Sequence, residues 1–85
     1  RDPKLAWAQR HPDLFPVEVN RAPQATLLRV PGIGPQGAAS IVQARRSARL
    51  RSLDELRRLG VRSQQAAPFI LLDGRSPQYQ LRLFT

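Results

Sequence analysis

Hydrophobic residues recur at helical spacing on both sides of a short glycine-containing segment in the middle of the chain. Leu27, Leu28 and Val30 end the first apolar run, and Ile41 belongs to the second. The Pro-Gly-Ile-Gly-Pro sequence of residues 31–35 stops one helix and favours the start of another. The pattern therefore predicts two helices joined by a tight hairpin.

The segments before this hairpin predict shorter elements. Asp2 predicts the N-terminal cap of a helix over residues 3–11, because proline follows it at the first helical position. A tight turn and a brief extended segment are expected over residues 12–19. Asn20 predicts the cap of the next helix, with residues 21–23 as its first turn.

After the hairpin, the second helix is expected to run from residue 35 to residue 46 or 48. Ser52 and Glu55 form a capping box that predicts a further helix, and Gly60 ends it. The segment from residue 56 to residue 70 repeats the first motif at an offset of 28 residues.

The repeat predicts a second, degenerate hairpin. Gly60 falls on Gly32, whereas Arg62 replaces Gly34. We expect this hairpin to pack against the first and to supply core more than phosphate contacts. Pro68 interrupts its last helix, so a partly fortuitous repeat is the alternative.

These elements predict one small all-α domain of four to five short helices over residues 1–72. The composition becomes polar and rich in turn residues after Leu72. A flexible C-terminal tail is therefore expected over residues 73–85.

The hairpin has the features of an anion site. Gly32 and Gly34 permit close approach of another molecule to the backbone. With Gly34 as N-cap and Pro35 as first helical residue, the amides of Gln36 and Gly37 are expected to point outward unpaired. A helix N-terminus of this kind binds anions, and phosphate is the expected one.

The hairpin resembles the helix-hairpin-helix motif of DNA repair and competence proteins. The matching residues are Leu28, Val30, Pro31, Gly32, Ile33, Gly34, Ala38 and Ile41. The resemblance implies that the hairpin binds the sugar-phosphate backbone and does not read sequence. The site would comprise Gly32, Ile33, Gly34, Gln36 and Gly37, with binding through main-chain amides.

Two further points concern this hairpin. Some members of the family hold potassium or sodium on hairpin carbonyls, which here would be those of Leu28, Val30 and Ile33. The alternative to backbone binding is a plain corner between two helices that needs its glycines for the turn alone.

Basic residues are concentrated around the hairpin. The formal net charge is +8, and the stretch from Arg29 to Arg62 holds eight arginines against two acidic residues. This distribution is typical of a phosphate-binding surface. Four of these arginines, at the end of the second helix and in the following turn, are expected to reach neighbouring phosphates: Arg45, Arg46, Arg49 and Arg51. A solvated face of an arginine-rich protein is the alternative.

Composition excludes several function classes. The chain has no cysteine, which rules out disulfides and thiolate metal sites within it. Its single histidine, His11, cannot form a metal cluster or a catalytic relay alone, and Trp7 is interpreted as a core residue. We therefore expect a non-catalytic chain. The sequence shows neither a long apolar run nor a signal peptide, so a soluble, cytoplasmic, monomeric domain is expected.

The last residues resemble the pentapeptide with which bacterial replication and repair proteins dock on the sliding clamp. The match comprises Gln80, Leu81, Leu83 and Phe84, with Arg82 at the tolerant position. Leu83 and Phe84 would fill an apolar pocket. The alternative is that the tail folds back on the domain.

Residues 2–70 also look like the C-terminal region of bacterial putative DNA modification or repair proteins of the radical S-adenosylmethionine class. This resemblance implies a fragment whose parent enzyme uses an iron-sulfur cluster and S-adenosylmethionine in an upstream part. The sequence thus predicts binding of duplex or structured DNA without sequence preference, in order to hold an enzyme on its substrate. The alternative is a protein-interaction module that docks on the sliding clamp.

Overall fold

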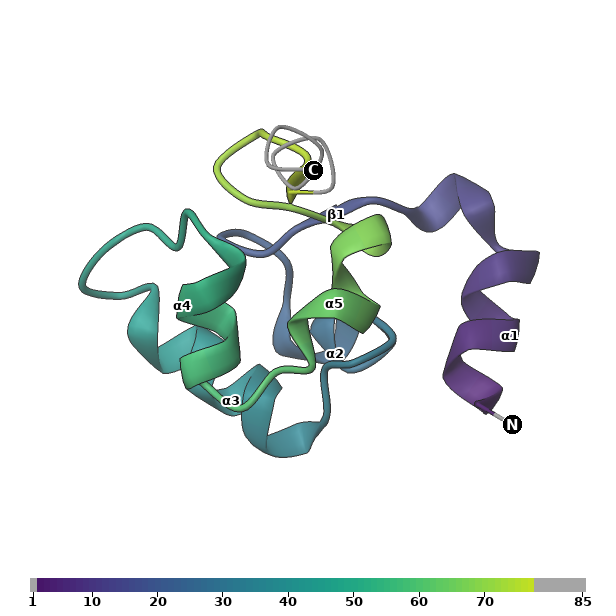
Figure 1. Ribbon diagram of the computed structural model, residues 1–85, viewed down its shortest axis with the longest axis horizontal. Helices are drawn as coiled ribbons and strands as arrows, with labels where there is room; N and C mark the ends of the chain where they lie inside the picture. Colours follow the sequence, from purple (N-terminus) through teal and green to yellow (C-terminus); the bar gives the residue numbers. More distant parts are fainter. Residues whose placement is uncertain (1, 78–85) are drawn as a thin grey trace.

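Short helices dominate the structure, a computed structural model that describes residues 2–77 (Figure 1). In chain order the elements are α1 (Pro3–Arg10), the 3-10 helix η1 (Pro12–Leu14), β1 (Val17–Glu18), α2 (Gln24–Leu27), α3 (Pro35–Ala44), α4 (Leu53–Arg58), α5 (Ser63–Ala66), the 3-10 helix η2 (Ala67–Phe69) and β2 (Ile70–Leu71). None of the helices in this part of the chain is long and apolar enough to span a membrane.

The two strands correct the all-α prediction. They pair in parallel, with Val17 opposite Ile70 and Glu18 opposite Leu71. Pro68 lies in η2 directly after α5, where proline opposes continuation of an α-helix, and the extended residues that follow pair with β1. The fold is therefore mostly helical with a small parallel sheet.

The α2–α3 and α4–α5 pairs each enclose a glycine hairpin, and the two hairpins lie side by side (Figure 1). Gly32 and Gly60 occupy equivalent positions with φ of +88° and +92°. The Arg62 amide donates a hydrogen bond of 2.9 Å to the Gly32 carbonyl. The predicted packing of the second hairpin against the first is confirmed.

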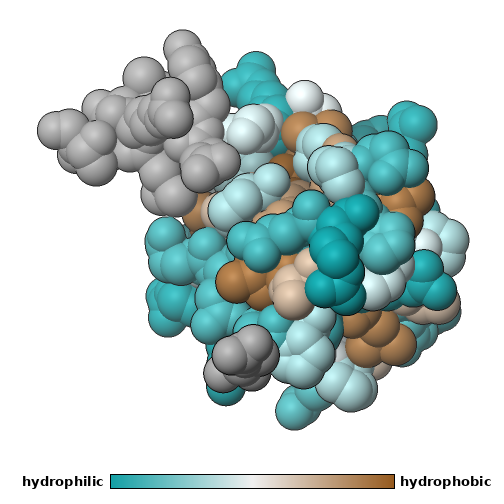
Figure 2. All heavy atoms as spheres, turned by 90° about the vertical axis from the view of Figure 1, so that its right-hand side faces the viewer, coloured by the Kyte–Doolittle hydropathy of each residue, from teal (hydrophilic) through white to brown (hydrophobic). Residues whose placement is uncertain are grey.

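Helix α1 lies at the edge of the molecule, on the right in Figure 1. Asp2 caps it as predicted, because its side chain accepts hydrogen bonds from the amides of Lys4 and Leu5. Figure 2 shows this side: hydrophilic residues cover most of it, with separate hydrophobic patches between them. The large apolar side chains that the structure leaves exposed are Leu5, Leu14 and Leu28.

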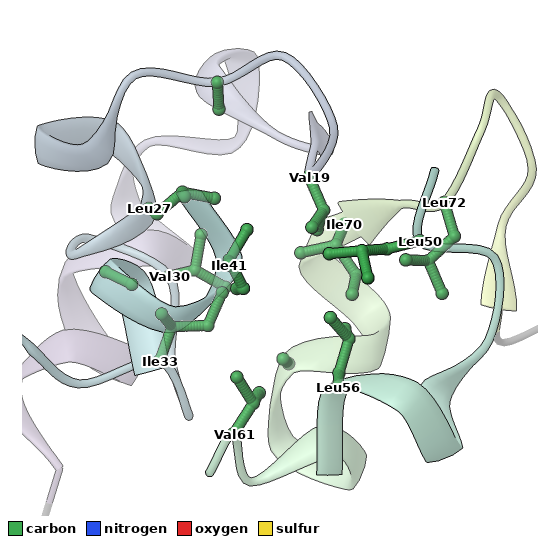
Figure 3. Packing of buried hydrophobic residues seen from close by; sticks show 13 residues of the cluster. Val19, Leu27, Val30, Ile33, Ile41, Leu50, Leu56, Val61, Ile70 and Leu72 are labelled. Atoms are coloured by element: carbon green, nitrogen blue, oxygen red, sulfur yellow. The ribbon is translucent and has the colours of Figure 1, made fainter. Parts of the chain in front are cut away.

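The core lies between the α2–α3 half and the α4–α5 half of the fold (Figure 3). Leu27, Val30 and Ile41 come from the first half, and Leu56 and Ile70 come from the second half and from β2. All five side chains are 0–1% exposed. Burial of both halves against each other fixes the relative position of the two hairpins.

Asn20 does not cap a helix, which corrects that prediction. Helix α2 begins at Gln24. The Asn20 side chain instead accepts a hydrogen bond of 2.7 Å from the Leu50 amide and donates one of 2.9 Å to the Leu50 carbonyl. Leu50 lies 30 residues from Asn20, so the sequence around Asn20 does not predict this pairing.

Residues 73–77, which we expected to begin a flexible tail, belong to the folded unit. The Glu18 carboxylate accepts hydrogen bonds from the amides of Asp73 and Gly74, and Pro77 is fully buried. Burial raises the pKa of Glu18, but hydrogen bonds from Asn20, Gly74 and Asp73 outweigh this effect and hold the pKa below its ordinary value. The folded domain therefore extends past residue 72.

Candidate nucleic-acid interface

The N-terminus of α3 presents backbone amides without protein partners. Gly34 is the N-cap, with φ −94° and ψ −175°, and Pro35 is the first helical residue, as predicted. No side chain caps this end of the helix. Among the hydrogen bonds within residues 2–77, none uses the amides of Gly32, Gly34, Gln36 or Gly37 as donors. These four amides therefore have no hydrogen-bond acceptor within the part of the chain that the structure describes.

The glycines of the hairpin serve different purposes. A Cβ on Gly32 would come within 2.6 Å of the Arg62 carbonyl oxygen, and its φ is positive, so the fold itself requires glycine there. A Cβ on Gly37 would lie 3.1 Å from the Val61 side chain, because α3 packs closely on the second hairpin. A Cβ on Gly34 would meet no atom of the described residues within 4 Å. Its backbone angles are open to any residue, so the fold does not require glycine at position 34.

Two peptide groups of the hairpin are held differently. The peptide between Gly32 and Ile33 is fixed at both ends: the Ile33 amide donates to the Val30 carbonyl at 3.1 Å, and the Gly32 carbonyl accepts from Arg62. The peptide between Ile33 and Gly34 is fixed at its carbonyl, which accepts a hydrogen bond from the Lys4 ammonium group. Its amide end has no hydrogen-bond partner among residues 2–77.

A pocket of about 630 Å³ lies beside these amides. The lining residues come from the start of α1 and from both hairpins: Asp2, Pro3, Lys4, Gly32, Ile33, Gly34, Gly60, Arg62 and Gln65. Lys4 and Arg62 contribute two positive charges to this pocket. Burial lowers the pKa of Lys4, and the nearby Asp2 carboxylate partly opposes that effect.

Lys4, Arg62 and Gln65 were not among the residues predicted for the site. Arg62 had a signal in the sequence, because the 28-residue repeat places it on Gly34 of the first hairpin. Lys4 had none, since its contact with Ile33 spans 29 residues and depends on where α1 packs.

The Arg45 guanidinium group is held by the protein through one of its nitrogens. Its Nη1 atom donates hydrogen bonds to the carbonyls of Val19 at 3.0 Å and Ala22 at 2.7 Å. These bonds tie the end of α3 to the loop before α2. Arg45 therefore helps to hold the described fold together.

The other three predicted arginines are exposed beyond the C-terminal end of α3. Arg49 forms an ion pair of 3.0 Å with Asp73, and Arg51 approaches the same carboxylate at 3.6 Å. Arg46 makes no ion pair or side-chain hydrogen bond within residues 2–77. Helix α3 is about 15 Å long, for ten residues at 1.5 Å each. The hairpin amides lie at its N-terminal end, and these arginines follow its C-terminal end in the sequence.

Two of the carbonyls expected to hold potassium or sodium have hydrogen-bond partners within the protein. The Ile33 carbonyl accepts the Lys4 ammonium group, and the Val30 carbonyl accepts the Ile33 amide. The Ile33 carbonyl thus already faces the positive charge of the Lys4 ammonium group. The Ile33 side chain is fully buried, which leaves only its backbone near the surface.

Trp7 and His11 belong to an aromatic cluster outside the hairpin. Their rings stack with centroids 4.1 Å apart, and the Trp7 and Phe15 rings form a T-shaped pair. The Arg29 guanidinium lies 5.2 Å from the Trp7 ring centroid. Within residues 2–77 no group of three or more His, Cys, Asp or Glu residues is arranged to hold a metal ion.

Residues 80–84, with the peptide that resembles a clamp ligand, lie outside the described residues. In comparisons with known proteins, the chain matches no protein-family model, no curated protein and no solved structure.

Proposed function

We propose that this domain binds the DNA backbone without sequence preference through the N-terminus of α3. The observation that supports this proposal most is the presence of glycine at position 34. The fold does not need glycine there, and serine or aspartate would cap the helix better. A phosphate that binds the unpaired amides does need a residue without a side chain, because any side chain would occupy the space it enters.

The charges around the amides fit the same ligand. Arg62 and Lys4 lie in the pocket beside Gly34, where their positive charges favour an anion. Arg46, at the other end of α3, would reach a different phosphate of the same backbone. Contacts of this kind give affinity and register rather than specificity.

We further propose that such a domain holds a DNA modification or repair enzyme on its substrate, as its resemblance to radical S-adenosylmethionine proteins suggested. It would contribute no catalytic group of its own. In that arrangement the hairpin supplies a fixed orientation on the backbone, while the enzyme part selects the base.

A salt titration tests the proposal. Fluorescence anisotropy with labelled duplexes of unrelated sequence should give equal affinities, and log affinity should fall with log salt at a slope of roughly −2 to −4 for two to four phosphates. Strong preference for one duplex, or absence of binding at low salt, would contradict the proposal.

A variant pair locates the site. Gly34→Val should weaken binding and leave helical content unchanged by circular dichroism, since a side chain has room there. Ala39→Val is the matched control, because it adds a valine to an exposed position of the same helix. If both variants bind like the wild type, the hairpin is only a corner between helices.

A further inference from the structure

We propose that Lys4 is a positioning residue for the hairpin: its ammonium group holds the Ile33 carbonyl and thereby directs the Gly34 amide toward the ligand. The inference rests on the proposed function, because it assigns a task to that amide. Lys4 reaches the hairpin from α1, across 29 residues of the chain.

The geometry of a single peptide group is the first step. The Ile33 carbonyl and the Gly34 amide belong to the same peptide group, and this peptide is trans, since Phe15–Pro16 is the cis bond within residues 2–77. In a trans peptide the carbonyl and the N–H point in opposite directions. A hydrogen bond that fixes the carbonyl toward Lys4 therefore fixes the N–H away from it.

The second step is that nothing else described holds this peptide group. The preceding peptide is held at both ends, by Val30 and by Arg62, whereas this one has the Lys4 contact alone. Removal of Lys4 would leave this peptide group without a hydrogen bond to residues 2–77, and therefore less ordered. The Gly34 amide would then have to be ordered when the ligand binds, at a cost in affinity.

The third step concerns charge. A hydrogen bond from an ammonium group is charge-assisted, and polarisation through the peptide makes the N–H at its other end a stronger donor. Lys4 thus performs what a bound cation on the Ile33 carbonyl would perform. We expect DNA affinity at equal ionic strength to be the same in potassium and sodium salts, and tighter binding in one of them would contradict this assignment.

Lys4→Met tests the role, with Arg10→Met as control. Arg10 is an exposed cation on the same helix, so both variants lose one positive charge from α1. Lys4→Met should lower DNA affinity about threefold to tenfold, the range for one lost hydrogen bond, whereas Arg10→Met should have a smaller effect. Lys4→Arg, which retains a charged donor, should restore part of the loss.

The salt dependence separates positioning from direct contact. If Lys4 acts through the Gly34 amide, the slope of log affinity against log salt should stay the same in Lys4→Met. A slope reduced by about 0.9 would show that Lys4 itself neutralises a phosphate, and this would overturn the inference.

A measurement without DNA keeps this inference separate from the proposed function. The 15N chemical shift of the Gly34 amide should change in Lys4→Met and stay near the wild-type value in Arg10→Met, while Trp7 fluorescence reports that α1 remains packed. An unchanged Gly34 shift would overturn the positioning role. A changed shift in a protein that binds no DNA would support the positioning role and refute the proposed function.

Discussion

Alanine substitutions at Gly34, Gly60 and Gly32 should form a graded series in stability. The three positions differ in two properties that the structure specifies, the sign of φ and the space around a Cβ. Gly34 has negative φ and open space, Gly60 has φ +92° and open space, and Gly32 has φ +88° and a carbonyl oxygen 2.6 Å from the Cβ position.

The expected magnitudes follow from these properties. At Gly34, a poorer N-cap and a less flexible unfolded chain oppose each other, so the change should be within about 0.5 kcal/mol. At Gly60, the left-handed backbone costs roughly 1–2 kcal/mol. At Gly32, overlap with the Arg62 carbonyl adds roughly 1–3 kcal/mol to that cost, about 2–5 kcal/mol in total. The whole domain of 85 residues is stabilised by roughly 4–13 kcal/mol.

Thermal unfolding followed by circular dichroism measures the series. At about 4–8 °C per kcal/mol, Gly34→Ala should stay within a few degrees of wild type, Gly60→Ala should melt about 4–16 °C lower, and Gly32→Ala should melt lowest. Equal losses at Gly32 and Gly60 would refute the contact between the hairpins. A loss at Gly34 equal to that at Gly60 would show that the fold needs glycine there, and would remove the main support for DNA binding.

Other predictions concern the arginines, Glu18 and the C-terminal residues. Arg45→Met should destabilise the domain by about 1.5–3 kcal/mol in urea unfolding, because its hydrogen bonds to two carbonyls are lost. Arg46→Met should leave stability unchanged and reduce the slope of log DNA affinity against log salt by about 0.9. The opposite pattern would refute these roles. Because the folded-state pKa of Glu18 is lowered, its contribution to stability is present at neutral pH and is lost as pH falls below the ordinary value of 4.5, and Glu18→Gln should flatten this dependence in acid unfolding. An isolated C-terminal peptide should bind a bacterial sliding clamp with micromolar affinity, about 8 kcal/mol, measured by calorimetry. The double substitution Leu83→Ala with Phe84→Ala should abolish this binding. No binding of the wild-type peptide would refute the resemblance to a clamp-binding peptide.

The local signals in the sequence predicted the local structure well. The Asp2 cap, the Ser52–Glu55 capping box and the helix that begins at Pro35 all lie where the residue types placed them. Each depends on interactions within four residues of the chain, which residue order alone specifies.

Features that depend on distant contacts were missed. The parallel strands, the pairing of Asn20 with Leu50 and the bonds from Arg45 to loop carbonyls join segments at least 23 residues apart. The sequence alone does not show which carbonyls will lie near an arginine at the end of a helix, so such an arginine is predicted to be solvated. In the candidate site, the glycines and amides were predictable, whereas the contribution of Lys4 was not, for the same reason.

An NMR titration tests DNA binding by the hairpin most directly. Amide spectra of the 15N-labelled domain would be recorded at low salt with increasing amounts of two duplexes of unrelated sequence. We expect the largest shift changes at Gly32, Gly34, Gln36 and Gly37, with the same pattern for both duplexes. Changes that leave these four amides unaffected, or a spectrum that neither duplex alters, would contradict the account.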